Sequence, residues 1–527
     1  MGLLPQRRHP ALRIAPPRGQ LGGAPPGRAA PPSRRRCGTA LLACALLLGG
    51  CQGRYYFSPE EPPSGVLRYS LETLPYQEYW TGLSFNGKKI GFNRVAVRRE
   101  GEGHVIESET ALQMRLLDRN KGFRMFALDR IAPDLQLREF EYRYSLDGSN
   151  LELRGRVEGE RLQLQIVNAA GVHEQALDLG QEPVYPRSAL LLYPLVQGIR
   201  PGVNYRYWVY DAEDRQLSEV RQYVTGYERS NLFAGGAYRL QTSIRAQEAT
   251  AWIGAKGQPL LESSLDGVMT ALLQREAQAR NYLVQAALNR EETLINYSLV
   301  PADRRIADPR KASALTLALS GMGEFLLPVP NSRQQCAPAD NGDVICRVLA
   351  TVAHREPAPP DEHQLQKYLE HTPILPTGHP TLELLATDIA GGLEDPGERM
   401  RAVFSWIRDN IGDDAVDVFT ALDVLKQRNA ECQGQSFLYT SLARTLGIPT
   451  RVVNGLVYSK RRNGFLYHTW AESWDGNAWQ SIDPTLGQFP VDVTHIRLID
   501  GAEISDLTPL LQLIGRIQAR VLEVGAP

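Results

Sequence analysis

The feature that most constrains the fold is alternation of apolar and polar residues from Tyr76 to about Asp178, broken by two-residue turn signals. Asn86-Gly87 separates EYWTGLSF from KKIGFNRVAVRR, and Asp147-Gly148 follows LREFEYRYSL. Asn-Gly and Asp-Gly accept the positive φ angles that tight hairpin turns need. Alternation on this scale predicts a large, curved antiparallel sheet.

The same pattern resumes in NYRYWVYDAEDRQLSEVRQYVTGY and AYRLQTSIRA, so we predict a β-rich antiparallel domain over residues 76–295. Residues 186–198 are expected to form a helix or cap, and residues 265–290 fit either a helix or further strands. A shorter block, residues 296–362, is predicted to be a small β-rich module or the closing strands of the preceding domain.

From residue 373 onward the spacing of apolar residues changes to three and four, as in TLELLATDIAGGL, DPGERMRAVFSWIRDNI and FTALDVLKQRN. A β-rich segment follows these helices. We therefore predict a multidomain chain, with an N-terminal all-β antiparallel region followed by an α+β domain over residues 373–527.

The first 51 residues hold eight arginines and no acidic residue, and the apolar run GTALLACALLLGGC follows the last arginines. This pattern is typical of a secretory signal, predicted over residues 1–50, although a short buried helix is the alternative. Leu48-Gly49-Gly50-Cys51 resembles the bacterial lipobox, which implies that Cys51 carries lipid and that residues 51–75 form a tether. The following residue, Gln52, suggests a lipid-anchored protein of the outer membrane, facing the periplasm.

Charge argues against nucleic-acid partners. The chain has 58 basic and 59 acidic residues, and loss of the eight leader arginines leaves 50 against 59, a net charge of −9. A mildly acidic protein lacks the basic surface that binds phosphate backbones. Peptides or proteins are the expected partners, together with a membrane reached through the lipid anchor.

The cysteines then divide by position. Cys336 and Cys346 are close enough in sequence to form a local disulfide in an oxidising compartment. Cys432 remains as the odd thiol. It precedes an amphipathic run with leucines at 438, 442 and 446 that ends at Gly447 and Pro449, so Cys432 lies in the first turn of a predicted helix. The positive end of the helix dipole favours the thiolate there, although a small buried side chain is the alternative.

A predicted hairpin supplies a histidine and a carboxylate. If Asp475-Gly476 is a two-residue turn between GFLYHTWAESW and NAWQSIDPT, His468 lies directly opposite Asp483. The carboxylate would then hold one imidazole nitrogen and leave the other for a thiol. A shift of the loop by one residue removes this pairing, and either residue alone fits a structural role.

Four successive blocks of this sequence resemble the transglutaminase-like superfamily. In chain order they are the helix that begins at Cys432, LARTLGIPTRVVNGLVY, YHTWAESW and WQSIDPTLGQ. The resemblance covers residues from about 381 to 501 and implies a papain-like core. By it, Cys432 is the nucleophile, His468 the general base and acid, and Asp483 the orienting carboxylate. Relatives often have Gly two residues before the cysteine, where this chain has Ala430, which leaves the local substrate contacts open.

Three further residues are candidates near this site. Trp470 and Glu472 share a strand face with His468 and either line the substrate cleft or pack behind the triad. Gln427 is a candidate side-chain donor to an oxyanion, beside the backbone N–H of Cys432. No metal or other cofactor is expected.

Two functions follow. The first is cysteine-dependent acyl transfer on peptide or glutamine-type amides, by hydrolysis or transamidation, with envelope proteins or peptidoglycan peptides as possible substrates. The alternative is a non-catalytic binding or scaffolding lipoprotein that uses the β-rich region and retains the C-terminal domain as a relic.

Overall fold

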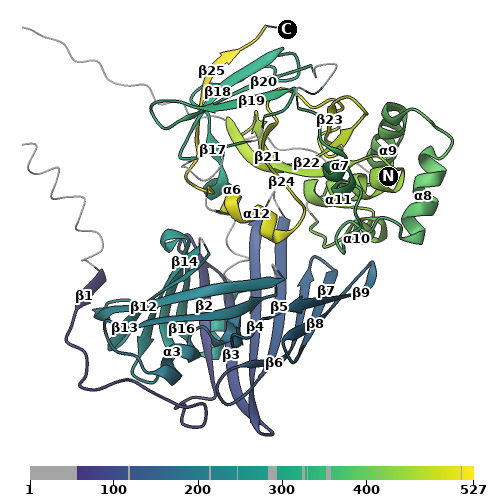
Figure 1. The fold of residues 1–527 in the computed structure, drawn as a ribbon. Coiled ribbons are helices and arrows are strands. Elements are labelled where there is room, and N and C mark those ends of the chain that lie inside the picture. Colours follow the sequence, from purple (N-terminus) through teal and green to yellow (C-terminus); the bar gives the residue numbers. More distant parts are fainter. Residues whose placement is uncertain are drawn as a thin grey trace, which may run out of the picture. The chain divides into compact units, whose positions relative to one another are not determined.

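The computed structural model describes residues 56–527 except 117–118, 213–214, 246, 283–292, 323–326, 329, 352–355, 357, 415, 512 and 527. The predicted signal, Cys51 and the start of the tether lie outside the described residues. No helix in the described part of the chain is long and apolar enough to cross a membrane. The described residues divide into a β-rich sheet region and a C-terminal part that holds most of the helices (Figure 1).

The sheet region is one 16-stranded sheet within the described residues. Its strand order is β10-β11-β12-β13-β14-β15-β16-β2-β3-β4-β5-β6-β7-β8-β9, with β1 beside β12, and all neighbours are antiparallel except β10 and β11. The strands are β1 (Phe57–Pro59), β2 (Glu78–Phe85), β3 (Lys88–Glu100), β4 (Gly103–Leu116), β5 (Arg119–Ile131), β6 (Leu137–Leu146), β7 (Ser149–Glu158), β8 (Arg161–Asn168), β9 (Gly171–Asp178), β10 (Val184–Pro186), β11 (Asn204–Asp211), β12 (Gln216–Ser230), β13 (Gly236–Ile244), β14 (Gln247–Gly254), β15 (Pro259–Ser264) and β16 (Met269–Gln274).

The two turn signals in the first half of this sheet form the predicted hairpins. Asn86 and Gly87 have φ angles of 47° and 73°, and Asp147 and Gly148 have φ angles of 45° and 91°. Both central residues therefore adopt the left-handed conformation that matches the twist of the flanking strands. The antiparallel sheet expected from the alternation is confirmed.

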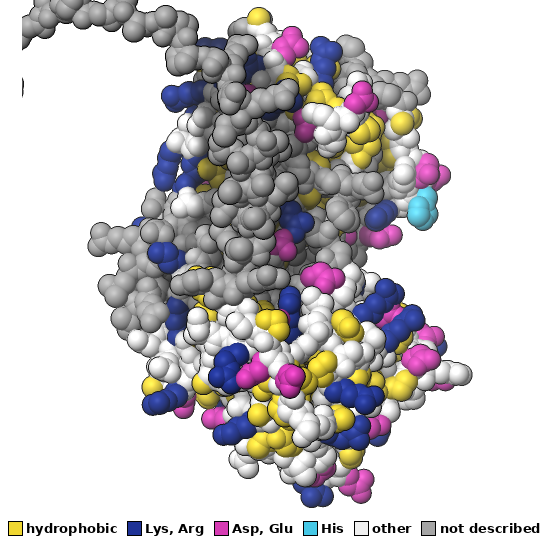
Figure 2. Space-filling model, turned by 90° about the vertical axis from the view of Figure 1, so that its left-hand side faces the viewer, with side chains coloured by type: hydrophobic (Ala, Val, Ile, Leu, Met, Phe, Trp, Pro, Cys, Tyr) yellow, Lys and Arg dark blue, Asp and Glu magenta, His cyan; other side chains and the backbone are white. Residues whose placement is uncertain are grey.

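Short helices accompany the sheet. The 3₁₀ turn η1 (Arg187–Ala189) and helix α3 (Leu192–Gln197) occupy the segment predicted as a helix or cap, and they pack into one of the sheet's apolar clusters. The segment left open between helix and strand contains η2 (Leu265–Gly267), β16 and α4 (Glu276–Arg280). On the face in Figure 2, basic and acidic side chains are interspersed over the lower, sheet-bearing part of the molecule.

The C-terminal part is built on a five-stranded sheet in the described residues, with order β17-β22-β21-β24 and β23 paired to β22. Its helices, α8 to α11, pack against this sheet through one apolar cluster. The elements are β17 (Val300–Pro301), α7 (Glu362–Lys367), α8 (Pro380–Ala390), α9 (Pro396–Asn410), α10 (Ala421–Gln427), α11 (Cys432–Thr445), β21 (Thr450–Ser459), β22 (Gly464–Trp474), β23 (Trp479–Ile482), β24 (Ile496–Asp500) and α12 (Ile504–Leu511).

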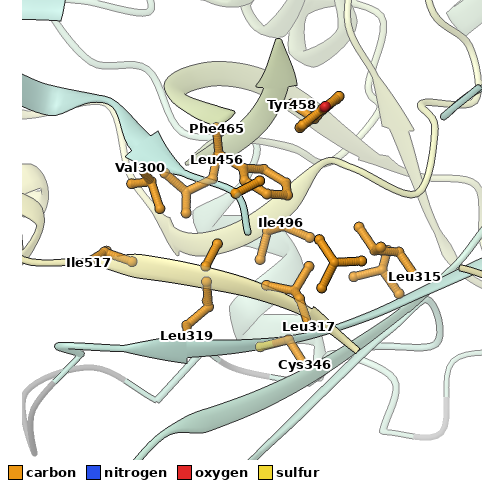
Figure 3. Packing of buried hydrophobic residues seen from close by; sticks show 14 of the residues in the cluster. Val300, Leu315, Leu317, Leu319, Cys346, Leu456, Tyr458, Phe465, Ile496 and Ile517 are labelled. Atoms are coloured by element: carbon orange, nitrogen blue, oxygen red, sulfur yellow. The ribbon is translucent and has the colours of Figure 1, made fainter. Parts of the chain in front are cut away.

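A second sheet covers the same five strands from another side. Its order is β19-β20-β18-β25, formed by β18 (Ala314–Ser320), β19 (Gln334–Pro338), β20 (Val344–Leu349) and β25 (Gln518–Val524). Figure 3 shows the cluster between them, where Leu317 and Ile517 meet Leu456, Phe465 and Ile496 of the five-stranded sheet.

This packing differs from the separate module expected over residues 296–362. Strand β17 pairs with β22, and strand β18 pairs with β25 from the C-terminal end of the described chain. The segment therefore shares its core with residues 373–527. Cys336 and Cys346 lie opposite each other on β19 and β20 and form a disulfide.

The helix that begins at Cys432 is the centre of the helical layer. Its side chains from Gly434 to Ala443 are all buried, and it contacts α8, α9, α10, β21 and β22. The helix ends before Gly447, which has a φ of 77°, as predicted from Gly447 and Pro449 in the sequence.

Candidate active site

Cys432 is the first residue of α11, and a pinned loop leads into it. The N–H of Ala430 donates to Gly412 O at 3.2 Å, and the N–H of Glu431 donates to Val416 O at 3.0 Å. The Gln435 side chain donates back to Ala430 O at 3.1 Å. Because these bonds fix the backbone before the helix, they also fix the direction in which the half-buried Cys432 thiol leaves it.

The first turn of α11 requires a glycine at position 434. A Cβ at Gly434 would lie 2.7 Å from the Cβ of Ala430 and 2.7 Å from a methyl group of Val418. Contacts this short do not occur between real carbon atoms, so any larger residue would push the first turn of α11 away from the loop. Gly434 thus keeps Cys432 close to the rest of the domain.

The predicted two-residue turn after β22 is wrong. Trp474 pairs with Trp479, so residues 475–478 form a longer loop. Oδ1 of Asp475 accepts hydrogen bonds from the N–H groups of Asn477 and Ala478, both at 2.8 Å, and this carboxylate stabilises the wider turn. The pairing is therefore shifted by two residues from the predicted one.

His468 and Asp483 still meet, as diagonal neighbours. The strand pairing ends with Ala471 opposite Ile482, which places Asp483 level with Trp470 and two residues from His468 along the same face. Nε2 of His468 lies 2.9 Å from Oδ2 of Asp483. Asp483 is fully buried, and its Oδ1 accepts the N–H of Leu486 at 3.0 Å.

The other side of the His468 ring interacts with the nucleophile candidate. The Cys432 thiol lies close enough to the His468 side chain and to the backbone N–H of Thr469 for both groups to lower its pKa. The three residues singled out from the sequence therefore form one chain of contacts, from sulfur through imidazole to carboxylate. In this arrangement the carboxylate orients the imidazole and the imidazole exchanges a proton with the thiol.

Comparison with known families agrees with this geometry. Residues 383–484 match the model of the transglutaminase-like superfamily core, a range that ends one residue after Asp483. The chain contains a transglutaminase-like domain. No curated protein matches the chain.

Solved structures give distant likenesses. A candidate cysteine protease from Cytophaga hutchinsonii is 15% identical with a TM-score of 0.27, over 41% of this chain and 85% of its own. A β-barrel-like protein of the DUF1849 family from Brucella abortus is 8% identical with a TM-score of 0.30, over 38% of this chain and 95% of its own. A candidate protease from Parabacteroides distasonis is 11% identical with a TM-score of 0.18, over 80% of this chain and 72% of its own.

Electrostatics in the transglutaminase-like domain favour a thiolate–imidazolium pair. Burial raises the pKa of Cys432, but the charge and hydrogen bond of His468 outweigh it and lower the pKa. Burial lowers the pKa of His468, but Asp483 and Cys432 raise it well above its ordinary value. Burial opposes ionisation of Asp483 as well, yet His468 and a second histidine lower its pKa. Both shifts, a lowered thiol pKa and a raised imidazole pKa, act in the direction of proton transfer from sulfur to imidazole.

The second histidine, His495, was not singled out by the sequence analysis. Its Nε2 lies 3.1 Å from the same Asp483 oxygen that contacts His468. The sequence offered one indication of a buried role, because His495 lies between the apolar residues Val493 and Ile496 in DVTHIRLIDG. Only the tertiary packing shows that its side chain faces Asp483. Sulfur, two imidazoles and one carboxylate thus form the buried polar centre of the domain.

These groups also have the composition of a metal site. His468, Asp483 and His495 place one potential ligand atom each within 4.8 Å of one another. Both histidines, however, direct Nε2 at one carboxylate oxygen at hydrogen-bonding distance, 2.9 and 3.1 Å. Donors that share an acceptor account for this arrangement, and we assign the three residues to a hydrogen-bonded network.

Two proposed cleft residues have structural partners. Trp470 is 1% exposed and packs its ring perpendicular to His495, with centroids 5.2 Å apart. Glu472 is 2% exposed and accepts from Arg451 at 2.6 and 3.0 Å and from Ser481 at 3.0 Å. Neither side chain reaches a solvent-open cleft, so the packing alternative describes both. Glu472 faces Ser481 across the hairpin.

Gln427 is also engaged elsewhere. Its side-chain amide donates to Oγ of Ser149, on strand β7, at 2.9 Å. This bond directs the amide toward the sheet region. The N–H of Cys432, at the first position of α11 where backbone donors have no intrahelical acceptor, is the oxyanion donor that the geometry retains.

A lysine from the sheet region reaches the residue before the nucleophile. Nζ of Lys121, on β5, lies 2.7 Å from Asp417, 3.4 Å from Glu431 and 3.5 Å from Asp147. Burial lowers the pKa of this lysine, but the surrounding carboxylates raise it overall. Burial raises the pKa of Glu431, as do its hydrogen bond to Asp417 and the nearby Cys432.

Proposed function

We propose that this protein is a cysteine-dependent acyltransferase or hydrolase acting on peptide or glutamine-type amides. The observation that carries the proposal is the contact chain in which Cys432, at the start of α11, meets His468, whose Nε2 is held 2.9 Å from buried Asp483. The transglutaminase-like family match over residues 383–484 supports the same class of chemistry. Papain-like catalysis needs these three groups in this relation.

The first half of the reaction forms an acyl-enzyme. The Cys432 thiolate attacks the amide carbonyl carbon, and the carbonyl electrons move to oxygen, where the Cys432 N–H donates to the oxyanion. The imidazolium of His468 then transfers its proton to the departing nitrogen as the carbon–nitrogen bond breaks. An amine or ammonia leaves, and a thioester joins the substrate acyl group to the sulfur.

The second half resolves the thioester. His468, now neutral, removes a proton from water or from a second amine as that nucleophile attacks the carbonyl carbon. The carbon–sulfur bond breaks, and the thiolate–imidazolium pair is restored. Water gives hydrolysis or deamidation, and an amine gives a cross-link.

We also propose a location and a substrate class on sequence grounds. The arginine-rich leader and the lipobox-like Leu48-Gly49-Gly50-Cys51 support a lipid-anchored protein of the cell envelope, in the outer membrane and facing the periplasm. Envelope proteins or peptidoglycan peptides are the substrates available there. Metabolic labelling with a clickable fatty acid, in the parent and in Cys51→Ser, tests the anchor, because only the parent should be labelled.

Thiol titration tests the catalytic proposal. The rate of iodoacetamide alkylation at Cys432 is followed by peptide mass spectrometry from pH 4 to pH 10. The parent should show a titration midpoint well below the ordinary cysteine value of about 8.5, and His468→Ala should return it to that value. His104→Ala, at a buried histidine of strand β4 in the sheet region, is the matched control and should behave like the parent.

An ordinary midpoint in both the parent and His468→Ala would reject the enzyme. That result would favour the alternative function, a binding or scaffolding protein in which the 16-stranded sheet is the working part.

A further inference from the structure

His495 touches the proposed catalytic carboxylate from a second direction. The residue directly precedes β24 and its side chain is fully buried. Its Nε2 lies 3.1 Å from Oδ2 of Asp483, the oxygen that His468 contacts at 2.9 Å. On the other side of its ring, Nδ1 lies 3.4 Å from Oδ1 of Asp492. The charged or titratable groups that face this ring are thus Asp483, Asp492 and His468.

The chemistry of the acceptor fixes the direction of these hydrogen bonds. An ionised carboxylate only accepts, and the pKa of Asp483 is lowered below its ordinary range. Nε2 of both histidines therefore carries a proton and donates to Asp483. For His468 this places the remaining nitrogen, Nδ1, on the side of the ring that is free for the thiol.

His495 is itself held in place. Asp492 accepts from the N–H and the hydroxyl of Thr494 at 2.9 and 2.6 Å and from the Gln488 side chain at 3.1 Å. Gln488 also pairs with Asp483 through two backbone hydrogen bonds of 2.9 Å. The indole of Trp470 packs perpendicular to the imidazole of His495. The ring is therefore enclosed on several sides and stays directed at Asp483.

We propose that His495 is a positioning residue of the catalytic site, which anchors the Asp483 oxygen that His468 contacts, from a second direction; this inference rests on the proposed acyl-transfer function. The Leu486 N–H holds one carboxylate oxygen and His495 holds the other, so the carboxylate cannot rotate away from His468. His495 does not contact the substrate. It acts through Asp483 on the orientation of the His468 imidazole, and the orientation of a catalytic group strongly affects rate.

Three variants separate a positioning role from a packing role. His495→Leu removes the donor and keeps an apolar side chain of similar size. His495→Gln places an amide N–H near the position of Nε2, and His495→Asn places one near the position of Nδ1, which reaches Asp492 but not Asp483. His104→Leu, in the sheet region, is the matched control. Each variant is assayed by Cys432 alkylation against pH, beside the parent and His468→Ala, with circular dichroism as the check on folding.

We expect His495→Leu and His495→Asn to lower the alkylation rate at pH 7 by about tenfold and to raise the midpoint of Cys432. His495→Gln and His104→Leu should stay within about threefold of the parent. If His495→Leu does not fold, the alkylation rates of His495→Gln and His495→Asn are compared to decide between a positioning role and a packing role. Equal rates for these two variants, or a folded His495→Leu that matches the parent, would overturn the inference while an activated parent thiol still supports the proposed function. An ordinary thiol in the parent would overturn both.

Discussion

Two buried carboxylates in the same hairpin have opposite uses. Glu472 on β22 and Asp483 after β23 are 2% and 0% exposed, and the pKa of each is lowered against the effect of burial by a basic partner. The partner of Glu472 is Arg451, whose guanidinium keeps its charge at every ordinary pH. The partner of Asp483 is His468, an imidazole that can release its proton. Of the two pairs, only the one with His468 contains a basic partner that can take up and release a proton near neutral pH.

The neighbourhood of the partner completes the difference. His468 lies beside the Cys432 thiol and the two groups shift each other's pKa, whereas the Arg451 guanidinium lies 4.1 Å from the centroid of the Trp479 ring. The His468–Asp483 pair therefore lies next to a nucleophile, whereas the Arg451–Glu472 pair packs against an aromatic ring. Glu472 and His468 lie on the same face of β22. Burial and strand position alone therefore do not show which of the two belongs to the candidate catalytic site.

The largest expected effect is on the titrating pair. His468→Ala should slow acylation of Cys432 by p-nitrophenyl acetate by about 10²- to 10⁴-fold, because the general acid–base group is lost. The release of nitrophenolate measures the rate. Glu472→Gln, assayed as folded protein, should change the rate by less than about threefold. A similar loss in both variants would remove the distinction between the two carboxylates.

The next effect is on stability and concerns the permanent pair. Arg451→Met should lower the free energy of unfolding by about 3–5 kcal/mol, because the buried Glu472 would lose the guanidinium that donates two hydrogen bonds to it. The double variant Arg451→Met with Glu472→Leu should recover most of this loss. Urea denaturation followed by tryptophan fluorescence measures both. If the double variant is as unstable as the single one, the loss comes from packing against Trp479.

A third prediction separates the pairs by pH, in a Cys432→Ala background that removes the thiol. Asp483 raises the folded-state pKa of His468, so the stabilising contribution of this pair is fully present below about pH 6.5 and is lost as the pH rises through the folded value. The difference in unfolding free energy between this background and its His468→Ala derivative should therefore shrink, by about 1–2 kcal/mol, toward alkaline pH. The difference caused by Arg451→Met should stay constant between pH 6.5 and pH 10.

The smallest effect is expected at the boundary with the sheet region. Lys121→Met removes the buried cation that contacts Asp147, Asp417 and Glu431; because the pKa of Glu431 is raised, this acid can become neutral when the cation is lost, and the loss of stability should be about 1–2 kcal/mol, below that of Arg451→Met. Cys432 alkylation should change by less than about threefold. Lys426→Met, at an exposed lysine of α10, is the control. A tenfold change in alkylation would instead show that the sheet region tunes the nucleophile.

Local sequence patterns predicted the parts of the molecule that depend on local physics. The turns at Asn86-Gly87 and Asp147-Gly148 formed as expected because both residues take positive φ. Asp475-Gly476 did not, because the Asp475 carboxylate accepts from two backbone N–H groups ahead of it and stabilises a longer loop. The same dipeptide thus has two competing uses, and only the surrounding structure selects one.

The site divides in the same way. The start of α11 at Cys432 and the order of Cys432, His468 and Asp483 were readable from the sequence, although the pairing that joins the last two is diagonal and not direct. His495 and Lys121 were not readable as partners of this site. Each reaches it through tertiary contacts, across 12 residues to Asp483 and 310 residues to Glu431, and no local periodicity reports such contacts.

The pairing of β25 with β18 has a consequence for biosynthesis. Leu456, Phe465 and Ile496 of the sheet that carries His468 share a core with Leu317 of β18 and Ile517, which directly precedes β25. During translation, Cys432 and His468 are therefore synthesised before β25, which completes the hydrophobic core under the strand that carries His468. We expect the reactive centre to mature only after β25 has been translated, so that a half-made polypeptide carries no competent nucleophile.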